Sequence, residues 1–190
     1  MWLNMVYKYN ELINIEEYKH DIKIKKALNE KKLFKLENGL YSDREYNNDL
    51  EIISKLYDSA IFTGESAYFY HGLTNVIPRY YYLDTKRKAR KIIDKRVKQT
   101  FSVDEYFSIG KTTINYNNAE ITIYDKERML IELIRNKNNI PFDMYKEIIE
   151  NYRKKIDSIN FLKVDEYLDS FKNSDNLFKA IQLEVMWWLI

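Results

Sequence analysis

Hydrophobic positions in the first 45 residues recur at helical spacing and then form two short runs on either side of a turn. The spacing predicts a helix over residues 7–15 and another over 20–30. The apolar runs 33–36 and 40–42 flank Asn38-Gly39, a pair that favours a tight β-hairpin because both turn positions need positive φ. Helix, lysine-rich helix and hairpin, in this order, are typical of a small winged helix-turn-helix.

The rest of the chain changes from helical spacing to alternation and back to helical spacing. Before the β segment we predict helices over residues 48–60 and 66–71. Dense strand formers and alternating residues then predict strands over 80–83, 97–101, 106–109, 112–116 and 121–123, the last two joined by a turn at 117–118. After residue 125, four apolar stripes at helical spacing predict a helical bundle.

These elements predict an α+β protein with two domains. Residues 1–45 would form the winged helix-turn-helix. Residues 46–190 would form a mixed α/β domain with a small antiparallel sheet in a central β segment (79–124) and a C-terminal helical bundle (125–190). Trp187 and Trp188 cannot both face the core from one helix, so we expect one of them to cover a hydrophobic neighbour or a partner chain.

Composition excludes several classes of protein. The 190 residues contain no cysteine, so a disulfide framework, a thiolate metal site and a cysteine nucleophile are ruled out. No apolar run is long enough to span a bilayer, and the first residues show neither a basic leader nor a small-residue cleavage site. We therefore expect a cytoplasmic protein that does not associate with membranes.

The charge is nearly balanced overall but is unevenly distributed. Between Tyr18 and Lys35 there are seven lysines against Asp21 and Glu30, and Asp21 is placed to cap the lysine-rich helix. A lysine-rich helix fits the DNA major groove, where asparagine pairs with adenine and lysines neutralise phosphates. The alternative is an ordinary solvated face. The candidate DNA-binding residues are Lys19, His20, Lys23, Lys25, Lys26, Asn29, Lys31, Lys32, Lys35 and Asn38.

A second basic cluster follows the tyrosine-rich strand at residues 80–83. It would contact DNA beside the primary site or an acidic surface, and the alternative is again a plain solvated segment. Its members are Lys86, Arg87, Lys88, Arg90, Lys91, Lys95, Arg96 and Lys98.

Features of an enzyme are sparse. His20 and His71 are far apart in the sequence, and neither lies in a cluster with metal-ligand spacing; His71 beside Gly72 is best interpreted as a structural or capping residue. The segment 63–66 (Thr-Gly-Glu-Ser) resembles the start of a nucleotidyltransferase site but lacks the alternate aspartates that hold Mg²⁺, and Ser66 is better interpreted as a helix N-cap. Asp104-Glu105 are adjacent, so their side chains diverge. We expect no catalytic residues, no metal and no cofactor.

Three segments together resemble a known family. Leu36–Ser42 (LENGLYS) resembles the wing of the AbiEi antitoxins of abortive-infection type IV toxin–antitoxin systems. Glu65–Leu73 (ESAYFYHGL), followed by Ile77-Pro78, is similar to that family's central motif, and Ile123–Leu130 (IYDKERML) to the motif at the start of its C-terminal helices. The three motifs occur in the family's order.

The resemblance implies an N-terminal winged helix-turn-helix that binds inverted repeats in the promoter of its own operon and represses it. It also implies a C-terminal domain needed for antitoxicity against an AbiEii-like toxin of nucleotidyltransferase fold, without a stable complex between the two proteins. No catalytic residue is implied. Two alternatives remain: a protein-interaction module that docks an acidic partner such as the toxin, and a nucleotidyltransferase-like enzyme.

Overall fold

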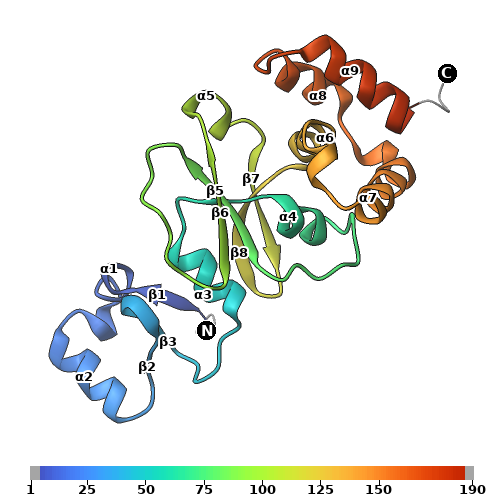
Figure 1. The fold of residues 1–190 in the computed structure, drawn as a ribbon. Helices are drawn as coiled ribbons and strands as arrows, with labels where there is room; N and C mark the ends of the chain where they lie inside the picture. Colours follow the sequence, from blue (N-terminus) through green and yellow to red (C-terminus); the bar gives the residue numbers. More distant parts are fainter. Residues whose placement is uncertain (1–4, 187–190) are drawn as a thin grey trace. The chain divides into compact units, whose positions relative to one another are not determined.

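The computed structural model describes residues 5–186 and divides the chain into two compact units (Figure 1). Unit 1 runs to Asp58 and includes Asn117–Glu120; unit 2 comprises Ser59–Tyr116 and the chain from Ile121 onward. The boundary between the units lies further along the chain than the predicted domain boundary between residues 45 and 46, because the helix after residue 46 belongs to unit 1. No helix in the described part of the chain is long and apolar enough to cross a membrane.

Unit 1 is a three-stranded antiparallel sheet with helical segments inserted between its first two strands. The strands lie in the order β1-β3-β2, and β3 pairs with both neighbours. A small core of Leu12, Tyr18, Ile24, Ala27 and Leu33 fills the space beside the sheet. In chain order the elements are β1 (Val6–Lys8), α1 (Tyr9–Leu12), the 3₁₀ turn Glu16–Tyr18, α2 (Asp21–Asn29), β2 (Phe34–Lys35), the 3₁₀ turn Glu37–Gly39, β3 (Leu40–Ser42) and α3 (Asp49–Leu56).

Two ion pairs attach α3 and the residues just after it to the beginning of the chain. Lys55 Nζ lies 2.9 Å from Glu11 Oε1, and Lys8 Nζ lies 2.6 Å from Asp58 Oδ2. The Asn48 side chain caps α3 by accepting a hydrogen bond from the Glu51 N–H at 2.8 Å. These contacts explain why α3 belongs to unit 1.

The predicted helix over residues 7–15 is wrong at both ends, because α1 covers Tyr9–Leu12 alone. Val6–Lys8 form a strand instead, because they pair with β3 in the register Val6↔Ser42 and Lys8↔Leu40. The second helix and the hairpin are confirmed: Asn38 and Gly39 have φ of 49° and 76°, as the turn requires. Asp21 is the first helical residue rather than the N-cap, and its carboxylate accepts a hydrogen bond from the Tyr9 hydroxyl at 2.6 Å.

Unit 2 is built on a five-stranded mixed sheet in the order β6-β5-β4-β8-β7. β4 is antiparallel to β5 and parallel to β8, and β5 is parallel to β6. The expectation of an antiparallel sheet was therefore wrong, because β4 and β8, and β5 and β6, run parallel. The strands are β4 (Ile61–Phe62), β5 (Tyr81–Lys86), β6 (Val97–Ser102), β7 (Lys111–Tyr116) and β8 (Ala119–Tyr124).

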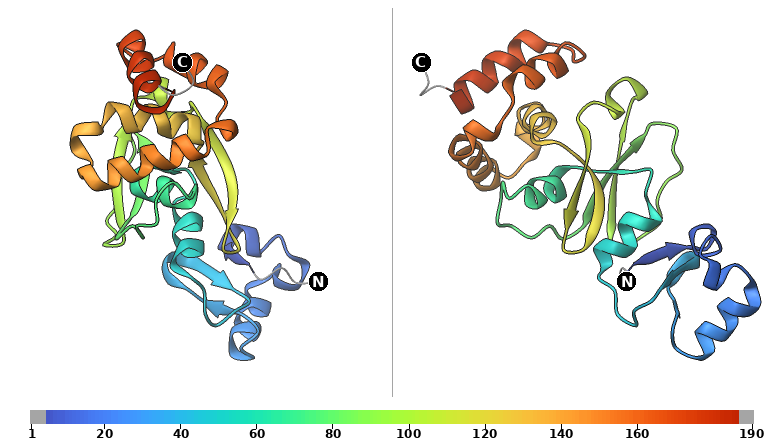
Figure 2. Two further views of the ribbon diagram at one scale, coloured as in Figure 1. Left: turned by 90° about the vertical axis from the view of Figure 1, so that its right-hand side faces the viewer. Right: turned by 180° about the vertical axis from the view of Figure 1, so that it is seen from behind.

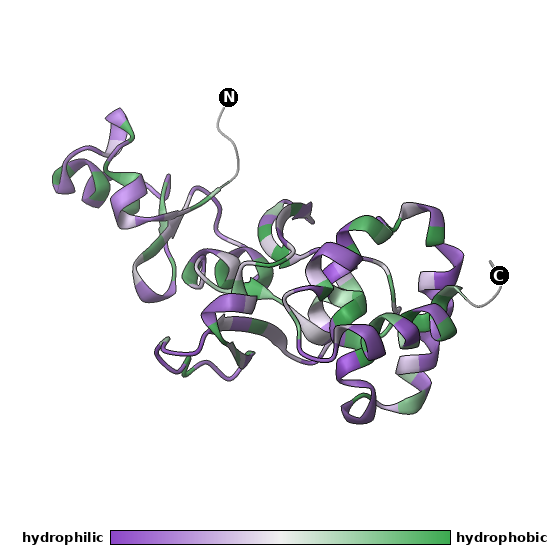
Figure 3. Ribbon diagram, turned by 90° about the horizontal axis from the view of Figure 1, so that it is seen from above, coloured by the Kyte–Doolittle hydropathy of each residue, from purple (hydrophilic) through white to green (hydrophobic). Residues whose placement is uncertain are grey.

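Helices α4 and α6 lie against one face of this sheet, and α7, α8 and α9 lie beyond them (Figure 2). Buried side chains of β8 and α6, among them Ile121, Ile123, Leu130 and Leu133, form the core between the layers. Hydrophobic and hydrophilic residues alternate along the same helices, as one buried and one exposed face require (Figure 3). The helices are α4 (Gly64–Tyr70), α5 (Asp104–Phe107), α6 (Lys126–Arg135), α7 (Phe142–Lys154), α8 (Phe161–Leu168) and α9 (Ser174–Ile181).

Most of the predicted elements of unit 2 are confirmed, with two differences. Residues 106–109 were expected as a strand, but 104–107 form the short helix α5, which buries Phe107. β4 was not predicted, because two residues are too few to show alternation. Trp187 and Trp188 lie outside the described residues.

Candidate nucleic-acid interface

The outer face of α2 carries most of the proposed contacts with DNA. Ile24 and Ala27 turn inward and are buried, which leaves Lys23, Lys25 and Lys26 exposed on the opposite side. All ten candidate residues, on α2 and on both sides of it, are exposed: Lys19, His20, Lys23, Lys25, Lys26, Asn29, Lys31, Lys32, Lys35 and Asn38.

Ile22 belongs to the same face but was not predicted from the sequence. It is 81% exposed and is spaced from Lys25, Lys26 and Asn29 by three, four and seven residues, so the four side chains share one helical stripe. An apolar side chain on a basic helix can contact the methyl group of thymine in the major groove. Ile22 is recognised as part of this face only from its exposure and its spacing together, because its hydropathy alone predicts a buried side chain.

Lys31 ends α2 in the left-handed conformation, where glycine is the usual residue. Its φ is 55°, and the Lys31 and Lys32 N–H groups donate to the carbonyls of Leu28 and Ala27 at 3.2 and 2.9 Å. This is the hydrogen-bond pattern of a Schellman motif, which directs the chain sharply into the hairpin. A lysine here strains the backbone but adds a positive charge at the C-terminal end of the helix, where the macrodipole is negative.

Acidic side chains partly neutralise this face. Glu30 lies 2.8 Å from Lys32 and 3.7 Å from Lys26, and the hydrogen bond with Lys32 holds the pKa of Glu30 below its usual value. The same contact raises the pKa of Lys32. Lys19 lies 3.6 Å from Glu16, while no ion pair is found among the described residues for Lys25, Lys31 or Lys35. The last three lysines are therefore the cations most available to an anionic partner.

The second basic cluster lies in unit 2, on the connection between the parallel strands β5 and β6. Gln99 holds this connection in place: its side chain accepts from the Ile92 N–H at 2.8 Å and donates to the Arg90 carbonyl at 3.2 Å. Arg96 is half-buried and pairs with Asp94 through two hydrogen bonds. The exposed members are Lys86, Arg87, Lys88, Arg90, Lys91, Lys95 and Lys98.

The residues considered for catalysis either have structural roles or are not grouped with other candidate catalytic residues. His71 ends α4, and its Nε2 lies 2.7 Å from the Tyr124 carbonyl oxygen. Ser66 is inside α4 rather than at its N-cap, and its hydroxyl accepts from the Tyr82 N–H at 2.9 Å and donates to the Tyr80 carbonyl at 3.2 Å. In the described part of the chain, no three histidine or carboxylate side chains are grouped so that they could hold a metal ion.

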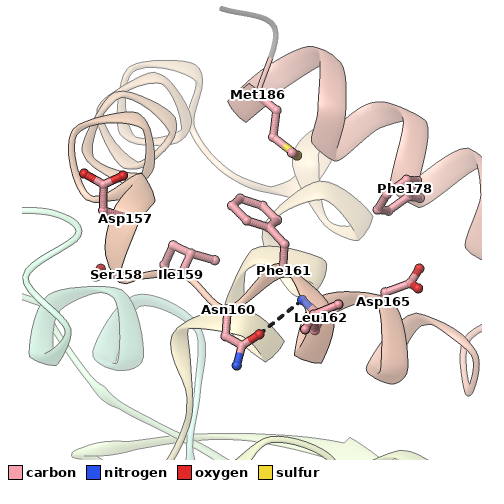
Figure 4. Close-up of a pocket in the computed structure, with 9 residues that line it drawn as sticks. All are labelled: Asp157, Ser158, Ile159, Asn160, Phe161, Leu162, Asp165, Phe178 and Met186. Carbon is pink, nitrogen blue, oxygen red and sulfur yellow. Dashed lines mark hydrogen bonds between the residues drawn. The ribbon is translucent and has the colours of Figure 1, made fainter. Parts of the chain in front are cut away.

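A groove between α8 and α9 is the other notable surface of unit 2 (Figure 4). Phe161, Leu162 and Phe178 line it together with Met186, and Asp157 and Asp165 lie at its rim. Asn160 caps α8 at one side by accepting from the Leu162 N–H at 3.1 Å. The acidic side chains make this groove unsuited to nucleic acid.

Comparison with known proteins does not assign the chain to a family. No family model matches the sequence, and no curated protein matches it significantly.

Proposed function

We propose that the protein is a sequence-specific DNA-binding regulator that binds double-stranded promoter DNA through unit 1. In this proposal unit 1 is a winged helix-turn-helix, α2 is the recognition helix, and β2 and β3 form the wing. The observation that carries the proposal is the exposed basic face of α2, which leads directly into an antiparallel hairpin of exposed Lys35 and Asn38.

The topology of unit 1 supports this assignment. Helices α1 and α2, with a 3₁₀ turn between them, lie between β1 and a β2–β3 hairpin, and β1 pairs with the far strand of that hairpin. Such an arrangement holds the second helix against the sheet by its apolar side and leaves the opposite side free to enter a groove. Asn29, at the end of α2, would pair with adenine, while the lysines would contact phosphates: Lys23, Lys25, Lys26, Lys31 and Lys35.

We further propose that the protein is the antitoxin and autoregulator of an AbiE-type toxin–antitoxin operon, a role in phage defence that involves no catalysis. The three ordered segments that resemble AbiEi antitoxins support this role. Co-expression with the nucleotidyltransferase-fold toxin tests it: growth is expected to be restored by the full chain. Loss of growth despite normal expression of both proteins would refute the antitoxin role and leave DNA binding unaffected.

The DNA-binding proposal is tested by fluorescence anisotropy with labelled DNA from upstream of the gene, and with shuffled DNA as competitor. Lys23→Ala/Lys26→Ala should weaken binding and flatten the plot of log affinity against log salt by roughly one unit per lost phosphate contact. Lys146→Ala/Lys179→Ala removes the same charge from exposed helical positions of unit 2 and is the matched control.

The control should retain wild-type affinity and slope. Equal binding of upstream and shuffled DNA would refute sequence-specific regulation. An unchanged slope in Lys23→Ala/Lys26→Ala would exclude this face of α2. If the protein instead forms a complex with the toxin that survives gel filtration, the basic face is a protein-docking surface.

A further inference from the structure

The connection between β5 and β6 presents a hydrophobic side chain within a basic surface that the proposed DNA contacts of α2 do not use. We call this connection, residues 87–96, the basic loop. Its Ile93 is 96% exposed, the highest exposed fraction of any large hydrophobic side chain in the described part of the chain. From Lys86 to Lys98 there are eight basic residues and one acidic residue, Asp94. The basic loop therefore offers one apolar side chain surrounded by positive charge.

Hydrogen bonds hold the backbone on both sides of Ile93. The Ile92 N–H donates to Gln99 Oε1 at 2.8 Å, and the Val97 N–H donates to the Asp94 carbonyl at 3.0 Å. The Asp94 carboxylate is paired with the Arg96 guanidinium at 2.8 Å, so the one acidic group of the loop is neutralised. A backbone fixed in this way lowers the entropy cost of binding a partner through Ile93.

The chemistry of the basic loop defines the surface that would cover it. A partner must bury Ile93 against apolar groups and place acidic groups beside it, because Lys91 and Lys95 lie two residues away on either side. DNA provides negative charge, but it can cover an isoleucine only with a thymine methyl group or an unstacked base step. A groove with an apolar lining and an acidic rim meets both requirements.

The groove between α8 and α9 has this composition. It has a volume of about 590 Å³, and Leu162 at its edge is 76% exposed. Three further large apolar side chains line it: Phe161, Phe178 and Met186 (Figure 4). The apolar lining is thus large enough to receive a branched side chain such as that of isoleucine.

The carboxylates at the rim of this groove have no positive partner of their own. Asp157 and Asp165 are exposed, lie on opposite sides of Phe161, and make no ion pair with a residue that the structure describes (Figure 4). Lys163, on the same helix as Asp165, lies 4.0 Å from Asp125 instead. The basic loop of the same copy does not compensate this charge, because none of its residues lines the groove.

We propose that the basic loop of one copy of the protein docks into the groove between α8 and α9 of a second copy. Ile93 enters the groove beside Leu162, and the lysines on either side of Ile93 contact the two carboxylates at the rim. The two surfaces differ, so each contact leaves one loop and one groove free, and association continues until a ring closes or a filament grows. The proposal does not depend on DNA binding by unit 1.

Sedimentation velocity of the full chain, from about 10 µM to about 1 mM, tests the proposal, because a contact of this size gives a weak interface. The average mass should rise with concentration at low salt and fall towards that of a monomer in about 0.5 M salt, where surface charges are screened. Ile93→Ser and Leu162→Ser should each weaken association roughly 10-fold. Ile77→Ser, at a site that is 77% exposed and outside both surfaces, is the matched control and should associate like the wild type.

An exchange of charges tests the pairing of the two surfaces directly. Lys91→Glu/Lys95→Glu and Asp157→Lys/Asp165→Lys should each abolish association, because like charges then face one another. An equimolar mixture of the two variants should associate again, because each loop then meets a groove of opposite charge. All four positions are exposed, and circular dichroism shows whether the variants have folded.

The proposal is overturned if the wild type stays monomeric at every concentration, if Ile93→Ser associates like the wild type, or if the mixture of charge variants does not associate. A Lys91→Glu/Lys95→Glu variant that associates like the wild type but binds DNA more weakly would make the basic loop a DNA contact instead. None of these outcomes bears on DNA binding by α2, which the Lys23→Ala/Lys26→Ala variant tests separately.

Discussion

At the scale of single residues, several side chains occupy positions that are poor for stability. Lys31 has φ of 55°, where glycine would be free of strain, and Asp84 and Arg128 are charges buried in unit 2. Left-handed backbone costs an L-residue about 1–2 kcal/mol, and a buried charge costs more unless it is paired. Such residues are concentrated at functional sites, where the strain is offset by the rest of the fold.

Replacement of Lys31 by glycine should change stability and DNA binding in opposite directions. Lys31→Gly removes the left-handed strain, so the free energy of unfolding should rise by about 1 kcal/mol in urea denaturation. The lost charge should weaken DNA binding and reduce its salt slope by roughly one unit. Lys35→Gly, which loses the same charge from a strand, should lower both stability and affinity. A Lys31→Gly variant less stable than the wild type would contradict this account.

His71 should make the stability of the protein depend on pH. Burial lowers the pKa of His71, and the ring's Nε2 lies 2.7 Å from the Tyr124 carbonyl. Below the ordinary histidine pKa of about 6.5 the unfolded chain takes up a proton first, so stability should fall as pH falls and level off below the folded pKa. Stability above pH 6.5 should be constant with respect to this group.

The measurement is urea denaturation between pH 8 and pH 5 for the wild type, His71→Gln and His20→Gln. Glutamine keeps an N–H donor without titrating, so His71→Gln should lose this part of the pH dependence. His20 is exposed, and its variant should follow the wild-type curve. If the three curves have the same shape, His71 is not the group responsible.

At the scale of elements, the sequence predicted the helices and turns that depend on local signals and missed the strands that depend on pairing with distant strands. The helix over 21–29 and the hairpin around Asn38-Gly39 were predictable because spacing and turn chemistry are local signals. β1 and β4 are only three and two residues long and are stabilised by pairing with neighbouring strands, so the sequence pattern did not predict them. Residues 106–109 were misassigned because tyrosine and phenylalanine favour strands, whereas Asp104 and Glu105 begin a helical turn.

The same difference between local and non-local signals applies to the candidate sites. The basic face of α2 could be predicted from residue types and spacing. The polar face shared by β5 and β6 could not, although Tyr82 and Asp84 alternate in one strand and Lys98 and Thr100 in the next. Only the parallel register of the two strands brings these four side chains onto one face, and register is a property of the folded sheet.

The N-cap of α8 provides a test of element stability. The Asn160 side chain accepts from the N–H groups of Leu162 and Lys163 at 3.1 and 3.2 Å. Asn160→Ala should lower the free energy of unfolding by about 1 kcal/mol, whereas Asn160→Ser, which retains an acceptor, should stay within a few tenths of the wild type. Urea denaturation of both variants is the measurement. Equal losses for alanine and serine would show that the side-chain cap contributes nothing.

At the scale of the whole molecule, the proposed DNA contacts belong to unit 1. Formal net charge is only +2, so long-range attraction to DNA must come from the local density of lysines in unit 1 rather than from the chain as a whole.

The placement of β4 in the sheet also has a consequence for synthesis on the ribosome. β4 pairs with β5 on one side, but its parallel partner on the other side, β8, comes about 60 residues later in the chain. At a bacterial or eukaryotic elongation rate of 5–20 residues per second, the nascent chain waits roughly 3–12 s for this partner. During that interval one edge of Ile61 and Phe62 stays unpaired, and an unpaired hydrophobic strand edge can pair with another chain.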